Sequence, residues 1–379
     1  MRLGPAKRVR RIVFVAMIVA LVPVAVSYAT AMAGPSNSNA FVRSVEWLRG
    51  QGAAGTVAQI ESLYYRLTAP DKGGPNLKSL PKVGVKTGVA FGGNRPNVIG
   101  GPTATAAYRP PPVTPFINPP LAGEGQWQAT RPWLAGNPPV LVTTIRNEPD
   151  YPRVVAGLAW IDAKSTKVTL NPGRQEPSVQ IDRGAMEVPL ALRKNLLATF
   201  NGGFKLADSN GGFALNGHTY SPMVKGQATL IGYQDGTVNV IDWGQGRAAP
   251  KSATFARQNL PLIVDNGAAS TNPNARCHWT ATTDCGPIMI WRSGIGVDAH
   301  GNLIYAAGNN QTVSSLASAL ARAGAVRAME LDVNNYWVSF ISYGLSGARQ
   351  PTNLLPEMHR SPSRYLTPDD RDFFAVYAR

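Results

Sequence analysis

The chain has 379 residues, and its 37 Lys and Arg residues against 22 Asp and Glu residues give a formal charge of +15. The positive residues are scattered through the body and form no run interleaved with aromatic residues. This pattern favours a solvated basic surface, so no nucleic-acid partner is predicted. The length exceeds that of one ordinary core and predicts one large domain with appendages, or two domains.

The N-terminus carries a basic cluster followed by an apolar stretch. The stretch from Ile12 to Ala33 has no charged residue, and about 20 apolar residues are enough to cross a bilayer. Positive charge stays on the cytoplasmic side, so we expect everything after Gly34 to lie outside the cytoplasm. Ala31-Met32-Ala33 also fits a signal-peptide cleavage site, which would release a secreted protein. We favour the uncleaved membrane anchor because the stretch is long for a signal peptide. The basic cluster consists of Arg2, Lys7, Arg8, Arg10 and Arg11.

Residues 34–69 are predicted to form a helical stem. Phe41 to Leu48 indicates a short helix, and apolar residues at helical spacing indicate a second one with Thr56 as its candidate N-cap. Residues 70–139 are rich in Pro, Gly and Asn. They predict an extended spacer that lies against the domain or crosses the wall, with one short strand over residues 83–91.

From Val140 onward, short alternating apolar segments predict strands, and a single helix ends near Gly324. A buried strand is expected directly after this helix, over residues 325–333. We therefore predict an α+β domain over residues 140–379, with a mixed β-sheet and few helices. The other predicted strands are 141–145, 154–161, 168–170, 196–200, 229–233, 238–243, 288–297, 303–307 and 373–377.

Two glycine-rich turns are the first candidate sites. Asn201-Gly202-Gly203 follows an apolar strand, where glycine lets backbone N–H groups approach an anion and Asn can donate to a sugar or phosphate oxygen. A plain tight turn explains the same residues. A second turn, at Asn216-Gly217, precedes His218. His218 is either a general acid or base, or a surface residue.

Charged residues within apolar strands are the other candidates. Arg292 either binds phosphate with its planar guanidinium or forms a structural salt bridge, because a charge in a buried strand needs a partner. Glu330 and Asp332 are expected on one face of a strand, about 6–7 Å apart. Such a pair is costly unless it is solvated, paired, metal-bound or catalytic, and we favour a functional site. No cofactor is predicted, although a divalent metal bound by the carboxylate pair is not excluded by the sequence.

The two cysteines, Cys277 and Cys285, lie close together in the sequence. Export and the short spacing favour a disulfide. A zinc site with His278 is the alternative, but the spacing matches no common zinc pattern.

Taken in this order, the motifs resemble the phosphodiester glycosidase family over roughly residues 140–345. Asn201, Gly203 and Phe204 match the family's Asn-x-Gly-Phe turn, and Asn266-Gly267 matches a later Asn-Gly. The family's Leu-Asp-Gly-Gly-Gly-Ser corresponds to Leu331-Asp332-Val333-Asn334-Asn335-Tyr336. The Asp is kept and the three glycines are not, so the pocket must differ in shape from that of the family.

The resemblance implies an extracytoplasmic hydrolase that cleaves the C1–O bond of a sugar-1-phosphodiester in a surface glycan or wall polymer. Asp332 would act as the nucleophile or as the base for water, with Glu330 or His218 as the second group. Arg292 would hold the phosphate. The alternative is a non-catalytic envelope protein that keeps the fold and either binds a glycan or has a structural role. The residues expected to line the substrate are Asn201, Gly202, Gly203, Asn266 and Asn334.

Overall fold

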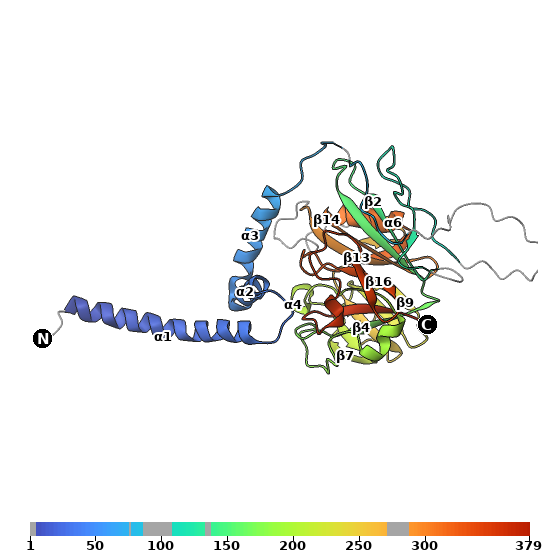
Figure 1. Ribbon diagram of the computed structural model, residues 1–379. Helices are drawn as coiled ribbons and strands as arrows, with labels where there is room; N and C mark the ends of the chain where they lie inside the picture. Colours follow the sequence, from blue (N-terminus) through green and yellow to red (C-terminus); the bar gives the residue numbers. More distant parts are fainter. Residues whose placement is uncertain (1–4, 76, 86–107, 133–137, 271–287) are drawn as a thin grey trace, which may run out of the picture. The chain divides into compact units, whose positions relative to one another are not determined.

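The computed structural model describes residues 5–75, 77–85, 108–132, 138–270 and 288–379 (Figure 1). The chain divides into two compact units, residues 1–63 and residues 64–379. The smaller unit is helical. It contains α1 (Pro5–Ala33), α2 (Ala40–Leu48), a π-helical turn at Arg49–Ala53 and the first part of α3 (Ala54–Leu67).

Helix α1 contains a segment, Val9–Ala33, that is long and apolar enough to cross a membrane, although a signal sequence meets the same criteria. Its last turns pack on α2. The Arg43 guanidinium donates to the Ala31 and Gly34 carbonyls, and the Trp47 indole donates to Ser27 Oγ at 3.1 Å. Cleavage after Ala33 would remove the contacts that Ser27 and Ala31 make with α2.

Both helices of the predicted stem are present. Asn39 caps α2 by accepting a hydrogen bond from the Val42 N–H at 2.9 Å. Helix α3 already begins at Ala54, so Thr56 lies inside the helix and its prediction as the N-cap was wrong. The reason is the preceding turn, where Gly52 adopts a φ of 88° and the chain re-enters the helical conformation earlier than expected.

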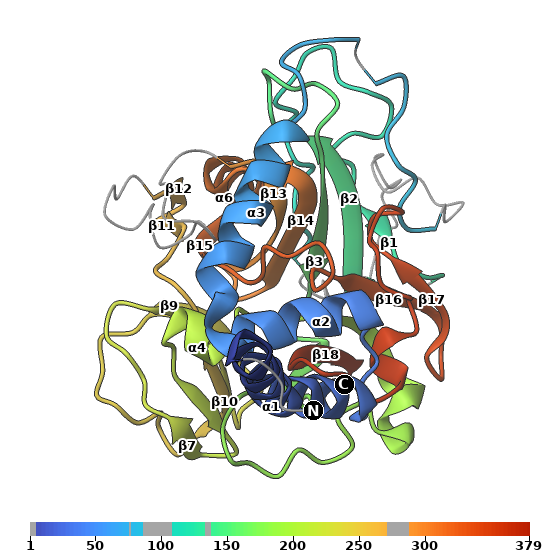
Figure 2. The same ribbon diagram turned by 90° about the vertical axis from the view of Figure 1, so that its left-hand side faces the viewer.

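Three sheets form the larger unit (Figure 2). The α+β class with few helices is confirmed, but every strand pair among the described residues is antiparallel, where we expected a mixed sheet. The eight-stranded sheet has, in order, β1 (Gln128–Ala129), β2 (Val140–Arg146), β3 (Val155–Ile161), β14 (Leu303–Gln311), β13 (Ile290–Asp298), β15 (Ala325–Glu330), β11 (Val264–Asp265) and β12 (Ala268–Ala269). One five-stranded sheet has β7 (His218–Ser221), β6 (Phe213–Leu215), β10 (Ala253–Gln258), β8 (Ala228–Tyr233) and β9 (Val238–Asp242). The other has β17 (Arg349–Asn353), β16 (Phe340–Leu345), β5 (Leu196–Asn201), β18 (Phe373–Ala378) and β4 (Thr166–Asn171).

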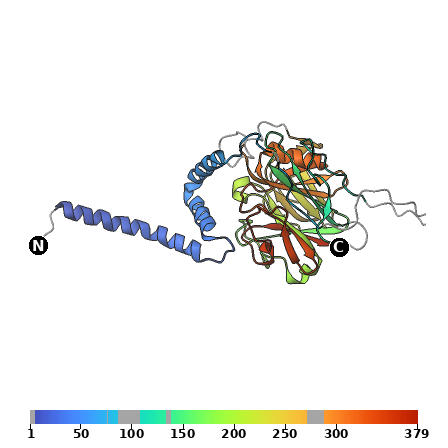
Figure 3. The same cartoon turned by 45° about the horizontal axis from the view of Figure 1, so that its top comes forward.

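The central strands of the eight-stranded sheet are buried on both faces. In β2, Val140 and Val142 join one hydrophobic cluster while Leu141 and Ile145 join another, as the two-residue period of a strand requires. Helix α6 (Val313–Arg322), orange near the top of Figure 3, covers the second cluster. Gly294 of β13 permits this close packing, because a Cβ there would lie 3.0 Å from Leu320 Cδ1.

Two strands escaped prediction because their sequences are polar. Strand β17 contains Gln, Thr and Asn, and β10 contains the buried residues Arg257 and Gln258. The hairpin of β6 and β7 was read as loop, although its turn residues Asn216 and Gly217 have the positive φ values, 52° and 74°, that such a turn needs.

Part of the Pro-rich segment is integrated into the larger unit. Glu124 forms an ion pair with Arg146 of β2 at 2.8 Å, and both side chains are buried. The Trp127 indole donates to the Pro111 carbonyl at 2.8 Å. This part of the predicted spacer therefore lies against the domain. Most of the strand expected at 83–91 falls outside the described residues.

Candidate functional site

Asp332 lies two residues after the end of β15, where Ser293 holds the chain against β13. The Ser293 N–H donates to the Asp332 carbonyl at 2.9 Å, and the Asp332 N–H donates to Ser293 Oγ at 3.1 Å. The Leu331 N–H donates to the Ser293 carbonyl at 2.8 Å. These bonds fix the backbone that carries the Asp332 carboxylate.

The Asp332 carboxylate is buried and held at both oxygens. The Asn334 N–H donates to Oδ1 at 2.9 Å, and Arg371 Nη2 donates to Oδ2 at 3.1 Å. The Asp332 side chain is 5% exposed and that of Arg371 is 8% exposed, so the pair reaches the surface only at its edge. Burial raises the pKa of Asp332 above its ordinary 3.8, and the positive charge of Arg371 opposes this rise.

Asn201 connects three elements around this loop. Its Oδ1 accepts hydrogen bonds from the Ser339 N–H and the Tyr305 hydroxyl, both at 3.0 Å. Its Nδ2 donates to Ser293 Oγ at 3.1 Å and to the Gly202 carbonyl at 2.8 Å. These bonds use the hydrogen-bonding capacity of the amide. Asn201, predicted to contact substrate, therefore orients the residues that support Asp332.

The glycines after Asn201 allow a close approach by Asp372. The Gly202 N–H donates to the Asp372 carbonyl at 3.0 Å, so this N–H is already satisfied. A Cβ on Gly202 would lie 2.7 Å from Asp372 Oδ2. A Cβ on Gly203 would meet the Asn259 side chain at 3.2 Å or more.

We expect Gly202→Ala to lower the free energy of unfolding by about 1–3 kcal/mol, because the new methyl group must displace Asp372. Gly203→Ala is the matched control and should cost less, because its Cβ would lie 3.2 Å or more from Asn259, whereas that of Gly202→Ala would lie 2.7 Å from Asp372. Urea denaturation of both variants would measure the difference. Equal stabilities would show that the Asp372 contact does not require glycine.

Arg292 and Glu330 form a buried ion pair. Arg292 Nη1 donates to Glu330 Oε1 at 2.6 Å, and neither side chain is more than 1% exposed. The Arg292 guanidinium also donates to the carbonyls of Gln311 and Ile288. Of the two interpretations left open by the sequence, the structural salt bridge is the one that the structure shows. Glu330 and Asp332 are thus each neutralised by their own arginine, which removes much of the cost of placing them close together.

The segment before β18 supplies several charged groups that the sequence did not predict. Asp369 accepts two hydrogen bonds from Arg364, at 2.7 and 3.0 Å, and a third from the Arg371 N–H at 2.9 Å. Arg371 also lies over the Trp337 ring, 5.1 Å from its centroid. Asp369 therefore organises the backbone that presents Arg371 to Asp332.

A second buried carboxylate, Glu176, approaches the same arginine. Its backbone N–H donates to the Asp370 carbonyl at 3.1 Å, which places it beside the segment that carries Arg371. Its Oε2 accepts from the Leu206 N–H at 3.2 Å. Burial raises the pKa of Glu176 above 4.5, opposed by the charge of Arg371. No sequence pattern indicated Glu176, because its neighbours come from distant segments.

Lys205 adds a second cation beside Asp332. It is half-buried and lies in the turn that links the glycines to α4 (Leu206–Ser209). Burial and then the charge of Arg371 lower the pKa of Lys205, while Asp208 and Asp332 oppose this shift. Asp332, Glu176, Arg371 and Lys205, called here the Asp332 cluster, make a small acidic and basic site around residues 201–206.

The remaining predicted residues lie apart from the Asp332 carboxylate or shape its loop. His218 is exposed on β7, the outermost strand of its sheet, with its ring against Tyr220. Asn266 is exposed in the turn between β11 and β12, with a φ of 49°. Asn334 Oδ1 accepts from the Tyr336 N–H at 2.8 Å. The predicted disulfide between Cys277 and Cys285 lies outside the described residues. Within the part of the chain that the structure describes, no group of three or more His, Cys, Asp or Glu residues could hold a metal ion.

No family model and no curated protein matches the chain. Among solved structures, the chain is similar to the catalytic domain of zebrafish N-acetylglucosamine-1-phosphodiester alpha-N-acetylglucosaminidase auto-inhibited by its pro-peptide. The identity is 16% and the TM-score 0.42, over 67% of this chain and 88% of that one. A hypothetical protein from Synechocystis has 16% identity and a TM-score of 0.33, and the match covers 63% of this chain and 64% of that one. A Burkholderia pseudomallei protein described as exported has 13% identity and a TM-score of 0.35, and the match covers 61% of this chain and 75% of that one. All three TM-scores are below 0.5, so function has to be inferred from the residues of the site itself.

Proposed function

We propose that the protein is an extracytoplasmic hydrolase that cleaves the glycosidic C1–O bond of a sugar-1-phosphodiester, as a divergent member of the phosphodiester glycosidase family. The observation that carries this proposal is the buried pair of Asp332 and Arg371, with Glu176 and Lys205 beside it. Two carboxylates and two cations in one site match a reaction at a sugar carbon whose leaving group is an anion.

The leaving group determines which residues are needed. A phosphodiester oxygen is already acidic, so it departs more readily when its charge is neutralised than when it is protonated. Arg371 and Lys205 supply this charge, because Arg292 is committed to Glu330 within the core. Arg371 exchanges its contact with Asp332 for one with the phosphate when substrate binds. The freed Asp332 oxygen then faces the anomeric carbon.

The reaction proceeds in two displacements. Asp332 Oδ2 attacks C1, the C1–O bond breaks, and the phosphate monoester leaves with the bonding electrons. A water molecule then attacks C1 of the glycosyl ester and releases Asp332. Glu176 accepts the proton of this water, and the free sugar departs.

The membrane-length segment of α1 suggests where the substrate is found. If Val9–Ala33 spans a membrane or is cleaved as a signal, residues 34–379 act outside the cytoplasm. The substrate class in that compartment is a surface glycan or wall polymer with sugar-1-phosphate links.

The direct test is to incubate the full-length chain with N-acetylglucosamine-1-phosphodiesters and a panel of other sugar-1-phosphodiesters. The full chain is used because Glu124 and Trp127, from the Pro-rich segment, pack on the domain. Release of free sugar and of the phosphate monoester would support the proposal. A folded protein that binds these compounds without releasing sugar would favour the non-catalytic, glycan-binding alternative.

The proposed roles predict a pH profile. Asp332 and Glu176 must both be ionised, and burial raises the pKa of each, so the rate should rise with pH along a limb that lies above the ordinary values of 3.8 and 4.5. Because two groups must each lose a proton, the logarithm of the rate should rise more steeply with pH along this limb than it would if one group titrated. Glu176→Gln should lower kcat by about 10²–10⁴-fold and leave the slope of a single proton. A slope that the substitution does not change would rule out Glu176 as the titrating base.

A further inference from the structure

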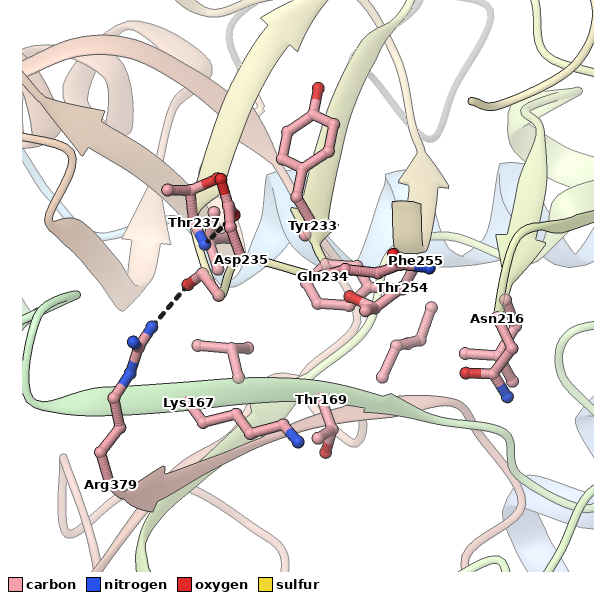
Figure 4. Close-up of a pocket in the computed structure, with 16 residues that line it drawn as sticks. Lys167, Thr169, Asn216, Tyr233, Gln234, Asp235, Thr237, Thr254, Phe255 and Arg379 are labelled. Carbon is pink, nitrogen blue, oxygen red and sulfur yellow. Dashed lines mark hydrogen bonds between the residues drawn. The ribbon is translucent and has the colours of Figure 1, made fainter. Parts of the chain in front are cut away.

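A cavity separate from the Asp332 cluster lies between the two five-stranded sheets. Its volume is about 420 Å³, within the range of small-molecule sites. Strand β4 forms one wall, and it is the last strand of its sheet. Figure 4 shows Lys167 and Thr169 of β4 on one side and Gln234, Thr254 and Phe255 on the other. None of Asp332, Glu176, Arg371 or Lys205 lines this cavity.

The inner surface of the cavity is apolar. Val168, Leu170, Leu215, Val238 and Phe255 line it and belong to, or pack against, the main hydrophobic cluster. Phe255 fits because the neighbouring strand has Gly232, where a Cβ would lie 2.4 Å from the Phe255 ring. Four of these side chains, Val168, Leu170, Val238 and Phe255, are at most 8% exposed, so a ligand would meet only their uncovered edges and the partly buried Leu215. This lining favours a ligand with a small apolar body.

The rim of the cavity carries net positive charge. Among the described residues that line it, the side chains of Lys167 and Arg379 are accompanied by one side-chain carboxylate, that of Asp235. Asp235 is already satisfied by the Thr237 N–H at 2.8 Å and the Thr237 hydroxyl at 2.7 Å. Two nitrogens of the Arg379 guanidinium are held by backbone carbonyls: Nε donates to Thr166 at 2.7 Å and Nη2 donates to Gly236 at 2.8 Å. Among the described residues, no carboxylate forms a salt bridge with Lys167.

We propose that this cavity is a second binding site, which takes a small anion with an apolar body. The apolar part would lie over Leu215 and the uncovered edge of Val238, and the anionic group would meet the Lys167 ammonium at the rim. The expected ligand is a short hydrocarbon that carries a carboxylate or a phosphate monoester. The site is independent of the proposed hydrolysis, because the two sites have no residue in common.

The test compares matched anionic and neutral probes. Hexanoate, hexyl phosphate and the neutral hexanamide would each be titrated by calorimetry into the full-length chain in lipid nanodiscs, with empty nanodiscs as the blank. We expect the anions to bind at least about tenfold more tightly than hexanamide. Whether hexanoate or hexyl phosphate binds more tightly distinguishes a carboxylate ligand from a phosphate ligand.

Three variants decide whether the binding occurs in this cavity. Lys167→Glu should weaken binding of both anions by about tenfold or more and leave hexanamide unchanged. Lys164→Glu, exposed in the turn before β4 and outside the cavity, is the matched control and should have no effect. Thr254→Trp should fill the cavity and abolish binding of all three probes. Equal binding of hexanoate, hexyl phosphate and hexanamide, or anion binding that survives both Lys167→Glu and Thr254→Trp, would overturn the proposal.

Discussion

Replacing Asp332 with Asn is expected to lower kcat/KM for a sugar-1-phosphodiester by at least about 10³-fold. The amide keeps the shape of the side chain and can still accept the Asn334 N–H hydrogen bond. It cannot attack the anomeric carbon as an anion. Because the leaving group needs no proton, the carboxylate is the group whose loss the reaction tolerates least. Initial rates of sugar release, at several substrate concentrations, measure this effect.

The same substitution leaves Arg371 without its carboxylate partner, so folding has to be checked alongside activity. We expect a loss of about 1–3 kcal/mol in unfolding free energy, which would still leave most of the protein folded at 25 °C. Asp265→Asn, an exposed carboxylate on β11, is the control and should keep full activity. A folded Asp332→Asn variant with more than a tenth of the wild-type rate would exclude Asp332 as the reacting group.

The largest loss of stability is expected from Asp369→Asn, at about 3–5 kcal/mol. Asp369 is fully buried and accepts hydrogen bonds from Arg364 and from the Arg371 backbone, with Arg360 3.5 Å away. A neutral amide would leave the buried Arg364 charge uncompensated. Urea denaturation at pH 7 measures the change, and Asp182→Asn, an exposed aspartate, should shift stability by less than about 0.5 kcal/mol.

The pH dependence of stability provides a second check on Asp369. Burial raises its pKa, but the charges and hydrogen bonds of Arg364, with Arg360, outweigh burial and lower the pKa below 3.8 on balance. The stabilisation is therefore present above pH 3.8 and is lost as the pH falls through the lowered pKa of the folded state. The Asp369→Asn variant lacks this titration. If both proteins lose stability in parallel in acid, Asp369 does not contribute as its contacts suggest.

Of the four residues of the Asp332 cluster, only Asp332 was a candidate from the sequence. It was singled out because it follows an apolar strand and a helix with a clear end, so local patterns were enough. Arg371 was not found, because it lies in a polar segment with no periodicity and reaches Asp332 only through the tertiary fold. Glu176 escaped notice for the same reason.

For two residues whose type suggested a binding role, the structure shows side chains that are already bonded within the protein. Arg292 has the right chemistry for phosphate, but its strand is buried on both faces, and the guanidinium is used to neutralise Glu330. Asn201 has the right chemistry for a sugar, yet its amide is fully engaged by Tyr305, Ser339, Ser293 and Gly202. A sequence shows which groups are available for chemistry, whereas burial decides which of them remain so.

The position of β18 has a consequence for how the protein is made. Residues 373–378 insert between β5 and β4, so the sheet cannot close until this segment arrives; Phe373 lies 172 residues after its partner Asn201 and 202 after its partner Asn171. Pairings of such high contact order form slowly. Until then the edges of β5 and β4 lack the partner strand that separates them in the folded sheet. Arg371 lies two residues before β18, so its contact with Asp332 forms only when this last strand docks, and the Asp332 cluster is completed late in folding.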